Sequence, residues 1–298
     1  YASDSGPGAG TTGNYGASYG GRPGLVNGLE YGSVTYPTDL GSGGEDFPGA
    51  GAIFLNISDT LNITGLVSSN GTDGSNGRGS GGSFYASTDK FVGSGIITTS
   101  GGSSTNGAGA GAGGRIAVFY STKYYTGRIE ATGGDSTNTA YRGGAGTVYL
   151  KDKEDSFGSL IILNQPDFTT DEVTVINKSL LGVTNLANFT IANGSDVRVD
   201  SYYNVTSVRV LESSNLLHSS NSGTQNFTLN LSSYNLTVDS SSFLNVNDRG
   251  YASDSGPGAG TSGNYGASYG GRPGLVNGLE YGSVTNPTDL GSGGEDFP

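Results

Sequence analysis

The sequence contains no cysteine, methionine or tryptophan, and its one histidine is His218. The absence of cysteine excludes disulfides and thiolate metal ligands, so stability must come from backbone hydrogen-bond ladders and stacked side chains. It does not fix the cellular compartment. No apolar run approaches the ~20 residues needed to span a bilayer. No signal peptide is visible, as expected if the chain is an internal stretch of a longer protein.

Charged residues are also scarce, at 13% of the chain, and the net charge is −12. Nucleic-acid backbones are bound by basic surfaces, so this balance argues against a nucleic-acid partner. The chain is rich instead in glycine, with 55 of 298 residues, and in Ser, Thr and Asn. Its apolar residues recur at regular positions, which distinguishes it from a low-complexity linker.

Residues 1–48 return as residues 251–298, and only two of the 48 positions differ: Thr12 becomes Ser262, and Tyr36 becomes Asn286. A segment that recurs after 250 residues indicates a tandem array. We therefore expect one full module followed by the start of the next, within a longer repetitive protein that is structural rather than catalytic.

A shorter period of about 31 residues lies inside the module. Four glycines, each followed by alternating apolar residues, are spaced by 31, 32 and 32 residues. Alternation with period two is typical of a strand with one buried face, so each segment is predicted to be a strand in one turn of a coil. The segments are GAGAIFL (49–55), GGSFYA (81–86), GGRIAVF (113–119) and GAGTVYL (144–150), aligned on Gly51, Gly82, Gly114 and Gly146.

A second set of strands is predicted after Gly65, Gly95, Gly127 and Gly158, with Val67, Ile97, Ile129 and Leu160 pointing inward. Beyond residue 170 the period shortens to about 19 residues. One expected column there is Phe189/Ile191, Val208/Val210 and Phe227/Leu229, and a second is Leu180, Val197, Leu216 and Leu236. No stretch has a helical period with caps, so almost no helix is expected.

Strands at a constant spacing, joined by turns too short for helices, predict an all-β fold in which coils stack as a right-handed parallel β-helix, or β-solenoid. Glycine suits its tight corners and the close approach of neighbouring coils. At ~4.8 Å per coil, roughly ten coils would advance each module by about 45–55 Å. Sandwiches or barrels are the main rival, but their strands do not recur at a constant period. The expected segments are a Gly/Tyr-rich coil segment at 1–48, glycine-rich coils at 49–165, shorter coils rich in glycosylation sequons at 166–250, and the start of the next module at 251–298.

The GxGGxI and GAGTVYL coils, and GRPG…YGS…P…LGSGG at 21–44 and again at 271–294, carry a resemblance. They resemble the glycine-rich β-helical repeat regions of very large extracellular proteins, including fibre and mastigoneme-like flagellar-hair proteins of protists and algae. The resemblance covers most of the chain and rests on compositional motifs. It implies a filament role outside the cell or at its surface.

Ten N-x-[ST] sequences without a central proline are candidate N-glycosylation sites. In seven of them the central residue is apolar, so in a strand that buries this residue the Asn and the Ser or Thr both face solvent. The stretch 226–232 is expected to bury Phe227, Leu229 and Leu231 and to expose Asn226 and Asn230 about 13 Å apart. The plainer interpretation is that outward Asn and Thr residues produce sequons by accident. The ten sites are Asn56, Asn62, Asn70, Asn177, Asn188, Asn193, Asn204, Asn226, Asn230 and Asn235.

A β-helical enzyme that degrades polysaccharides would need carboxylates clustered on adjacent coils. The acidic residues are instead scattered over loops, and GGEDFP (43–48) recurs once per module, so no catalytic residue is predicted. The acids considered are Asp4, Asp39, Glu45, Asp46, Asp152, Glu154, Asp155, Asp167, Asp171 and Glu172.

No metal or cofactor site is predicted. His218 stands among Ser and Leu, and one histidine builds neither a zinc site nor a catalytic triad. GAGAGAGG (107–114) lacks the GK[ST] ending of a phosphate loop. The sequence contains no calcium-binding loop of the EF-hand or nonapeptide kind. The remaining calcium hypothesis is the binding of isolated ions at acidic turns.

Tyrosine is frequent, with 18 residues, of which Tyr1, Tyr15, Tyr19, Tyr31 and Tyr36 lie in the duplicated segment. We expect these tyrosines to pack inside a glycine-rich core rather than to form a sugar-binding platform, since a tyrosine ring can pack while its hydroxyl remains hydrated. The same segment is a candidate joint between modules.

Together these features predict the shaft of an extracellular, glycan-bearing fibre, surface appendage or matrix filament. Its partners would be neighbouring modules of the same or identical chains, end to end. One alternative is an adhesin stalk with a binding tip elsewhere, which recognition domains beside the repeats would favour. Another is a β-helical polysaccharide-active enzyme, which an acidic cluster on one face would favour.

Overall fold

The computed structural model describes residues 1–10, 13–25, 28–166, 168, 172–260, 265–274 and 278–295. It is nearly all β, with 31% strand and 2% helix, and forms a parallel β-solenoid of about six turns. The predicted fold class is therefore confirmed, whereas the expectation of roughly ten coils was too high. The chain divides into two compact units. The first comprises Tyr1–Arg198, Tyr202–Leu216 and Leu231–Leu244, and the second comprises Val199–Ser201, Leu217–Asn230 and Asn245–Pro298.

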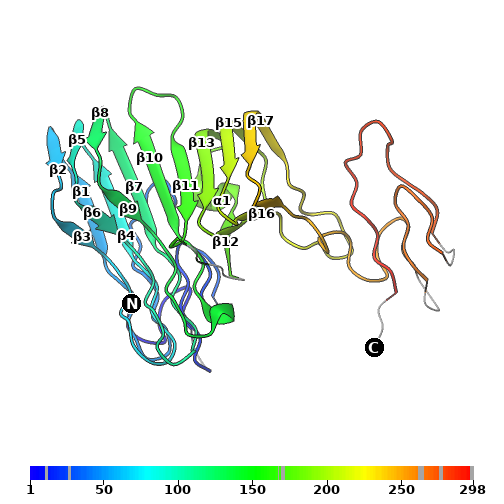
Figure 1. Cartoon of the computed structure of the whole chain (residues 1–298), viewed down its shortest axis with the longest axis horizontal. Helices are drawn as coiled ribbons and strands as arrows, with labels where there is room; N and C mark the ends of the chain where they lie inside the picture. The colour runs from blue at the N-terminus through cyan, green and yellow to red at the C-terminus, as the bar shows by residue number, and fades with distance from the viewer. Residues whose placement is uncertain are drawn as a thin grey trace. The chain divides into compact units, whose positions relative to one another are not determined.

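Each of the early turns of the first unit contributes one strand to each of three parallel sheets (Figure 1). The main sheet contains β1 (Ala52–Asn56), β4 (Ser83–Ser87), β7 (Arg115–Tyr120) and β10 (Thr147–Asp152). The second sheet contains β2 (Thr60–Asn62), β5 (Lys90–Gly93) and β8 (Thr122–Tyr125). The third contains β3 (Leu66–Ser68), β6 (Ile96–Thr98) and β9 (Arg128–Glu130).

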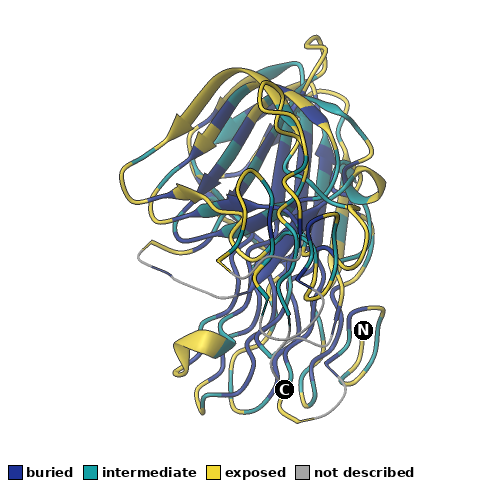
Figure 2. Ribbon diagram, turned by 90° about the vertical axis from the view of Figure 1, so that its right-hand side faces the viewer, coloured by how far each residue is buried: buried dark blue, intermediate teal, exposed yellow. Residues whose placement is uncertain are grey.

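The predicted column of the main sheet is confirmed residue by residue. Ile53 pairs with Phe84, Phe84 with Ile116, and Ile116 with Val148. The last three side chains are at most 3% exposed, and they join Phe91 from the second sheet in one core. In Figure 2 buried positions run along both strands and connecting turns, while exposed positions gather at loop ends and on some strands, such as β1 and the last strand of the main sheet. The alternation that the sequence shows is therefore the alternation of a coil with a filled interior.

The chain reverses direction after β10. The turn at 153–158 returns it as β11 (Ser159–Leu163), which pairs antiparallel with β10 through Tyr149 and Leu160. Leu160 was expected in the column of Val67, Ile97 and Ile129, and this prediction was wrong, because β11 adds to the main sheet instead. The same glycine and apolar pattern fits a strand in either sheet, and the tight turn decides between them.

Two sheets rather than three line the later turns. The main sheet continues from β11 to β13 (Asn185–Ala192), β15 (Tyr203–Val210) and β17 (Leu231–Val238). Facing it are β12 (Val173–Ile176), β14 (Asp196–Val199), β16 (Asn215–Leu217) and β18 (Phe243–Leu244). The helical elements of the described residues are one 3-10 turn, Thr139–Tyr141, and α1 (Lys178–Leu181).

The later columns differ in part from the predicted ones. Phe189 pairs with Val208 as expected, but the next member is Leu236 and not Phe227. The segment 226–230 forms no strand. Of the expected second column, Val197 and Leu216 lie on the neighbouring strands β14 and β16, whereas Leu180 belongs to α1. Leu216 was expected to be followed in its column by Leu236, but it pairs with Leu244 of β18.

Residues 1–48, here termed the first copy, contain no strand among their described residues. They run across successive turns of the first unit instead of adding a turn, unlike the expected coil segment. Backbone N–H groups of Ala17, Gly20 and Gly24 donate to Arg78 O, Gly113 O and Ala110 O at 2.8–2.9 Å. The first copy thus binds several coils together along the stack.

Two glycines show why the first copy can approach so closely. A Cβ atom on Gly21 would press against the carbonyl oxygen of Ala145, and one on Gly24 against that of Tyr141. Both obstacles are backbone atoms that cannot move aside. Glycine is required here by close backbone approach rather than by a turn.

Candidate functional site

The sequon asparagines of the later turns form the most regular surface feature. Asn188 on β13 and Asn204 on β15 are exposed, while the residues after them, Phe189 and Val205, are at most 1% exposed. The predicted pattern of outward Asn and inward apolar residue is confirmed at both sites. Ser207 pairs with Asn188 on one side and with Asn235 of β17 on the other. Asn188, Asn204 and Asn235 are termed the sequon face below.

The expected strand at 226–232 was wrong. Backbone N–H groups of Asn226 and Phe227 donate to Asn221 Oδ1 at 2.7 and 2.8 Å, and Asn221 Nδ2 donates to Phe227 O at 2.9 Å. This side chain closes a loop and keeps its backbone out of the ladder until Leu231. Asn226 and Asn230 are nevertheless exposed, as predicted.

The remaining sequons differ in what their side chains do. Asn56, Asn62 and Asn70 are exposed in the early turns. Asn177 caps α1 by accepting from Leu180 N at 3.0 Å. Asn193 donates through Nδ2 to Asn164 O at 2.9 Å, and the Ser195 of its sequon is only 1% exposed. Asn188 Nδ2 also donates, to Ser159 Oγ at 2.9 Å, but Asn188 and this bond are exposed. Asn193 is only partly exposed and its bond is partly buried, so Asn193 is a structural residue.

Several acidic residues serve the structure of the loops. Glu45 accepts the backbone N–H of Asn14 at 2.7 Å, and Asp152 accepts that of Glu154 at 3.0 Å. Asp46 binds the side chain of Asn76. Asp167 and Asp171 lie outside the described residues. Across the described positions, no three His, Asp or Glu side chains come together in a group that could hold a metal ion.

An open groove lies beside the third sheet. It is lined by Leu66, Asn70, Ile96, Arg128 and Glu130, among others. Its acidic side chains have partners: Glu130 pairs with Arg128 at 3.1 Å, and Asp73 in the same groove accepts from Ser103 N at 2.7 Å. The groove does not bring together two free carboxylates of the kind that glycoside hydrolysis uses.

His218 and the glycine run at 107–114 are both built into the fold. His218 is 3% exposed, and its Nδ1 lies 2.7 Å from Ser219 O, which can only accept, so Nδ1 carries the proton. In the glycine run, Gly109 N donates to Asn14 O and Ala112 N to Ala17 O. A strand, β7, follows it. It therefore anchors the first copy rather than forming a phosphate loop.

Tyr19 and Tyr31 of the first copy are packed, whereas Tyr1 and Tyr36 are exposed. The rings of Tyr19 and Tyr31 lie 4.7 Å apart. Tyr19 OH lies 2.6 Å from Ser83 Oγ, and Tyr31 OH donates to Leu40 O at 2.6 Å. Burial raises the pKa of Tyr19 to about 12 and also raises the pKa of Tyr31 well above its ordinary value.

These shifts predict a loss of stability in alkali. From about pH 10, tyrosine ionises in the unfolded chain while Tyr19 stays protonated in the folded chain until about pH 12. The unfolded state thus releases protons first, and the stability present below pH 10 is lost as the pH rises. We expect tyrosinate absorbance and circular dichroism to show a late group of tyrosines that titrates together with loss of strand structure. Ionisation of every tyrosine near pH 10 with the fold intact would contradict this.

Other aromatic side chains form a ladder on the outer face of the main sheet. Phe54 and Tyr85 are stacked at 4.6 Å with an interplanar angle of 8°, and Tyr36 lies 4.7 Å from Tyr85. Phe119 and Tyr149 continue the row. Because Phe54 and Tyr85 face each other, they do not present the flat, parallel faces on which a sugar ring would stack. This favours packing over carbohydrate binding.

No family model matches this chain, and comparisons with curated proteins and with solved structures give no match. Among the described residues, no helix is long and apolar enough to cross a membrane. Any functional conclusion therefore rests on the fold, the duplication and the sequon face.

Proposed function

We propose that the chain is part of the shaft of an extracellular, glycosylated fibre, surface appendage or matrix filament. The observation that carries this proposal is a ladder that exposes apolar side chains on both of its end strands. Repeat proteins that end in solution need polar capping repeats. Here the first strand, β1, exposes Phe54 by 48%, and the last, β17, exposes Leu236 by 50%.

Stacking modules end to end would bury these apolar ends and extend the backbone ladder. Each further coil adds ~4.8 Å, so the number of modules would set the length. The hydrogen bonds of a parallel ladder run along the stack, which suits it to carry axial tension. Glycans on the sequon face would cover the side of such a fibre and discourage lateral association of β-rich chains.

Site-resolved glycosylation tests this proposal. When the chain is secreted from a eukaryotic cell, we expect glycans on Asn188, Asn204 and Asn235, and none on Asn193. The first three side chains are exposed, whereas the amide of Asn193 is used inside the fold. Glycosidase treatment in heavy-isotope water followed by peptide mass spectrometry reads each site, and Asn204→Gln is the matched control. If all three asparagines carry no glycan, the proposed glycan coat is contradicted.

A further inference from the structure

The groove beside the third sheet lies on the outer surface of the early coils, and all of its lining residues belong to the first unit. The strands beside it are in register, so that Leu66 pairs with Ile96 and Ile96 with Arg128. Side chains alternate along a strand, and the next residue on β6, Ile97, is 0% exposed, so this row faces outward. The hollow has a volume of about 620 Å³, which lies in the range of pockets that hold small organic ligands.

Asn70, one of the predicted glycosylation sites, lines this groove and is held through its side-chain oxygen. Ser100 N donates to Asn70 Oδ1 at 2.8 Å, and Thr98 Oγ1 donates to the same atom at 2.9 Å. Because a backbone N–H can only donate, its partner must be the amide oxygen and not the amide nitrogen. Neither bond uses Nδ2, which is the atom that carries the sugar in an N-linked glycan.

A chain of hydroxyl groups on neighbouring coils fixes this orientation. Thr132 Oγ1 donates to Ser100 Oγ at 2.9 Å, and Ser100 Oγ lies 3.0 Å from Thr98 Oγ1. Each hydroxyl has one proton, and that of Thr98 goes to Asn70, so Ser100 donates to Thr98. The Asn70 amide is therefore oriented by contacts that extend over three successive coils.

Two sequon asparagines line the groove, and they differ in which atom the fold holds. Asn193 is partly exposed, and its Nδ2 donates to Asn164 O at 2.9 Å in a partly buried bond. Asn70 is exposed and is held by its oxygen instead. A glycan can therefore be attached to Asn70 without breaking either of the two bonds that orient its side chain.

The lining of the groove matches the two kinds of surface that a sugar unit has. A pyranose ring has an apolar C–H face and a rim of hydroxyl or acetamido oxygens. Leu66 and Ile96 supply apolar surface, and Leu66 is 66% exposed. Asn164 also lines the groove, is 1% exposed, and leaves its Nδ2 without a hydrogen-bond partner in the described part of the chain. An unpaired buried donor costs free energy, so this side of the groove favours a ligand that supplies an oxygen.

We propose that the groove binds the chain's own N-linked glycan at Asn70, with the first two N-acetylglucosamine units lying over Leu66 and Ile96. These side chains are within reach, because Leu66 precedes Asn70 by four residues, at most about 13 Å of extended chain. Attachment to Asn70 makes the binding intramolecular, which raises the effective concentration of the sugar at the groove. The inference rests on the proposed glycosylation, and it adds that one glycan has a fixed place in the fold.

Site-resolved deglycosylation of the folded, full-length chain tests this inference. The chain is secreted from a eukaryotic cell line that makes only high-mannose glycans, and endoglycosidase H then cuts between the two N-acetylglucosamine units. Only the minor fraction of chains with the Asn70 glycan outside the groove is cut, so we expect release there to be roughly 10- to 1,000-fold slower than at Asn204. Asn204 is the reference because it is exposed on β15. Peptide mass spectrometry reads both sites, and after denaturation both glycans should be cut at the same rate.

A leucine substitution assigns the protection to the groove. Leu66→Ala removes apolar surface from the groove, so it should bring the rate at Asn70 closer to that at Asn204 while the unfolding midpoint stays the same. Leu29→Ala is the matched control, because Leu29 is 65% exposed and lies outside the groove lining, and it should keep the protection. The inference is overturned, and the proposed function stands, if the folded parent chain shows equal rates at Asn70 and Asn204, if Asn70 is bare beside a glycosylated Asn204, or if Leu66→Ala leaves the protection unchanged. Bare asparagines at every sequon would contradict both.

Discussion

Replacing Arg115 with alanine is expected to lower the free energy of unfolding of the first unit by about 3–5 kcal/mol. Arg115 stands on β7 between Ser83 and Thr147 and is 0% exposed. Its guanidinium donates to Tyr31 O at 3.0 Å, to Tyr19 O at 3.4 Å and to Thr147 Oγ1 at 3.2 Å. It thereby fastens the first copy to the coils.

The size of this effect follows from what alanine leaves behind. Two buried carbonyl groups of the first copy lose a donor, and the volume of a large side chain becomes a cavity. Burial also lowers the pKa of Arg115, which reflects the cost of keeping its charge away from water. Arg115→Lys keeps that charge without the planar fork that reaches three acceptors, so it should destabilise as well.

Urea unfolding with hydrogen exchange checks the Arg115 prediction. We expect the amides of the first copy to lose protection before those of the main sheet. Arg128→Ala is the control, because Arg128 lies on β9 of the third sheet and its side chain is 67% exposed. If Arg115→Ala unfolds like the parent chain, Arg115 does not hold the first copy in place.

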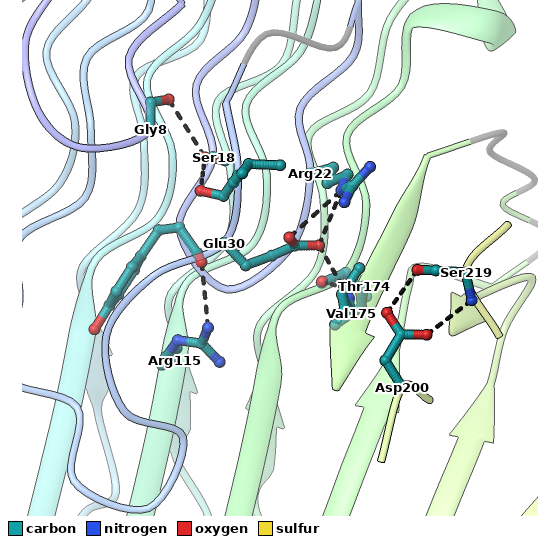
Figure 3. Close-up of polar contacts among 12 residues, drawn as sticks. Gly8, Ser18, Arg22, Glu30, Arg115, Thr174, Val175, Asp200 and Ser219 are labelled. Carbon is teal, nitrogen blue, oxygen red and sulfur yellow. Dashed lines mark hydrogen bonds and ion pairs between the residues drawn. The ribbon is translucent and has the colours of Figure 1, made fainter. Parts of the chain in front are cut away.

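Replacing Glu30 with alanine is expected to cost about 2–4 kcal/mol of folding free energy. The Glu30 side chain is 3% exposed, and its Oε1 lies 3.3 Å from Arg22 Nε and 2.9 Å from the backbone N of Val175 (Figure 3). Alanine would leave the β12 amide without its acceptor and the partly buried Arg22 without its counter-charge. Removing one partner of a buried pair is costly for that reason.

The duplication supplies a matched control for this prediction. Glu280 makes the same ion pair with Arg272 at 2.9 Å, but the side chains are 53% and 44% exposed for Arg272 and Glu280. Exposed ion pairs contribute little, so Glu280→Ala should leave the unfolding midpoint nearly unchanged. Equal effects of the two substitutions in thermal unfolding would show that Glu30 does not link the first copy to β12.

The coils of period 31 were predictable from the sequence because their determinants are local. A glycine at the corner and apolar residues at alternate positions specify both a strand and its inward face, and Ile53, Phe84, Ile116 and Val148 fall in register as the spacing requires. The outward asparagines followed from the same alternation at Phe189 and Val205.

The parts that sequence reasoning missed depend on contacts distant in the chain. The pattern at Phe227 and Leu229 is as good a strand pattern as that at Leu236 and Val238, and the Asn221 loop decides between them. The place of the first copy across the coils follows from glycines that admit close backbone approach. A cluster of glycines without alternating apolar residues, as at Gly20, Gly21 and Gly24, is the signal that would have indicated it.

Cryo-electron microscopy of the native, secreted material tests the central claim most directly. The account predicts filaments with an axial spacing of ~4.8 Å and with branched density on Asn188, Asn204 and Asn235. Discrete particles without that spacing, and with bare asparagine side chains on the sequon face, would contradict a glycosylated fibre built from these coils.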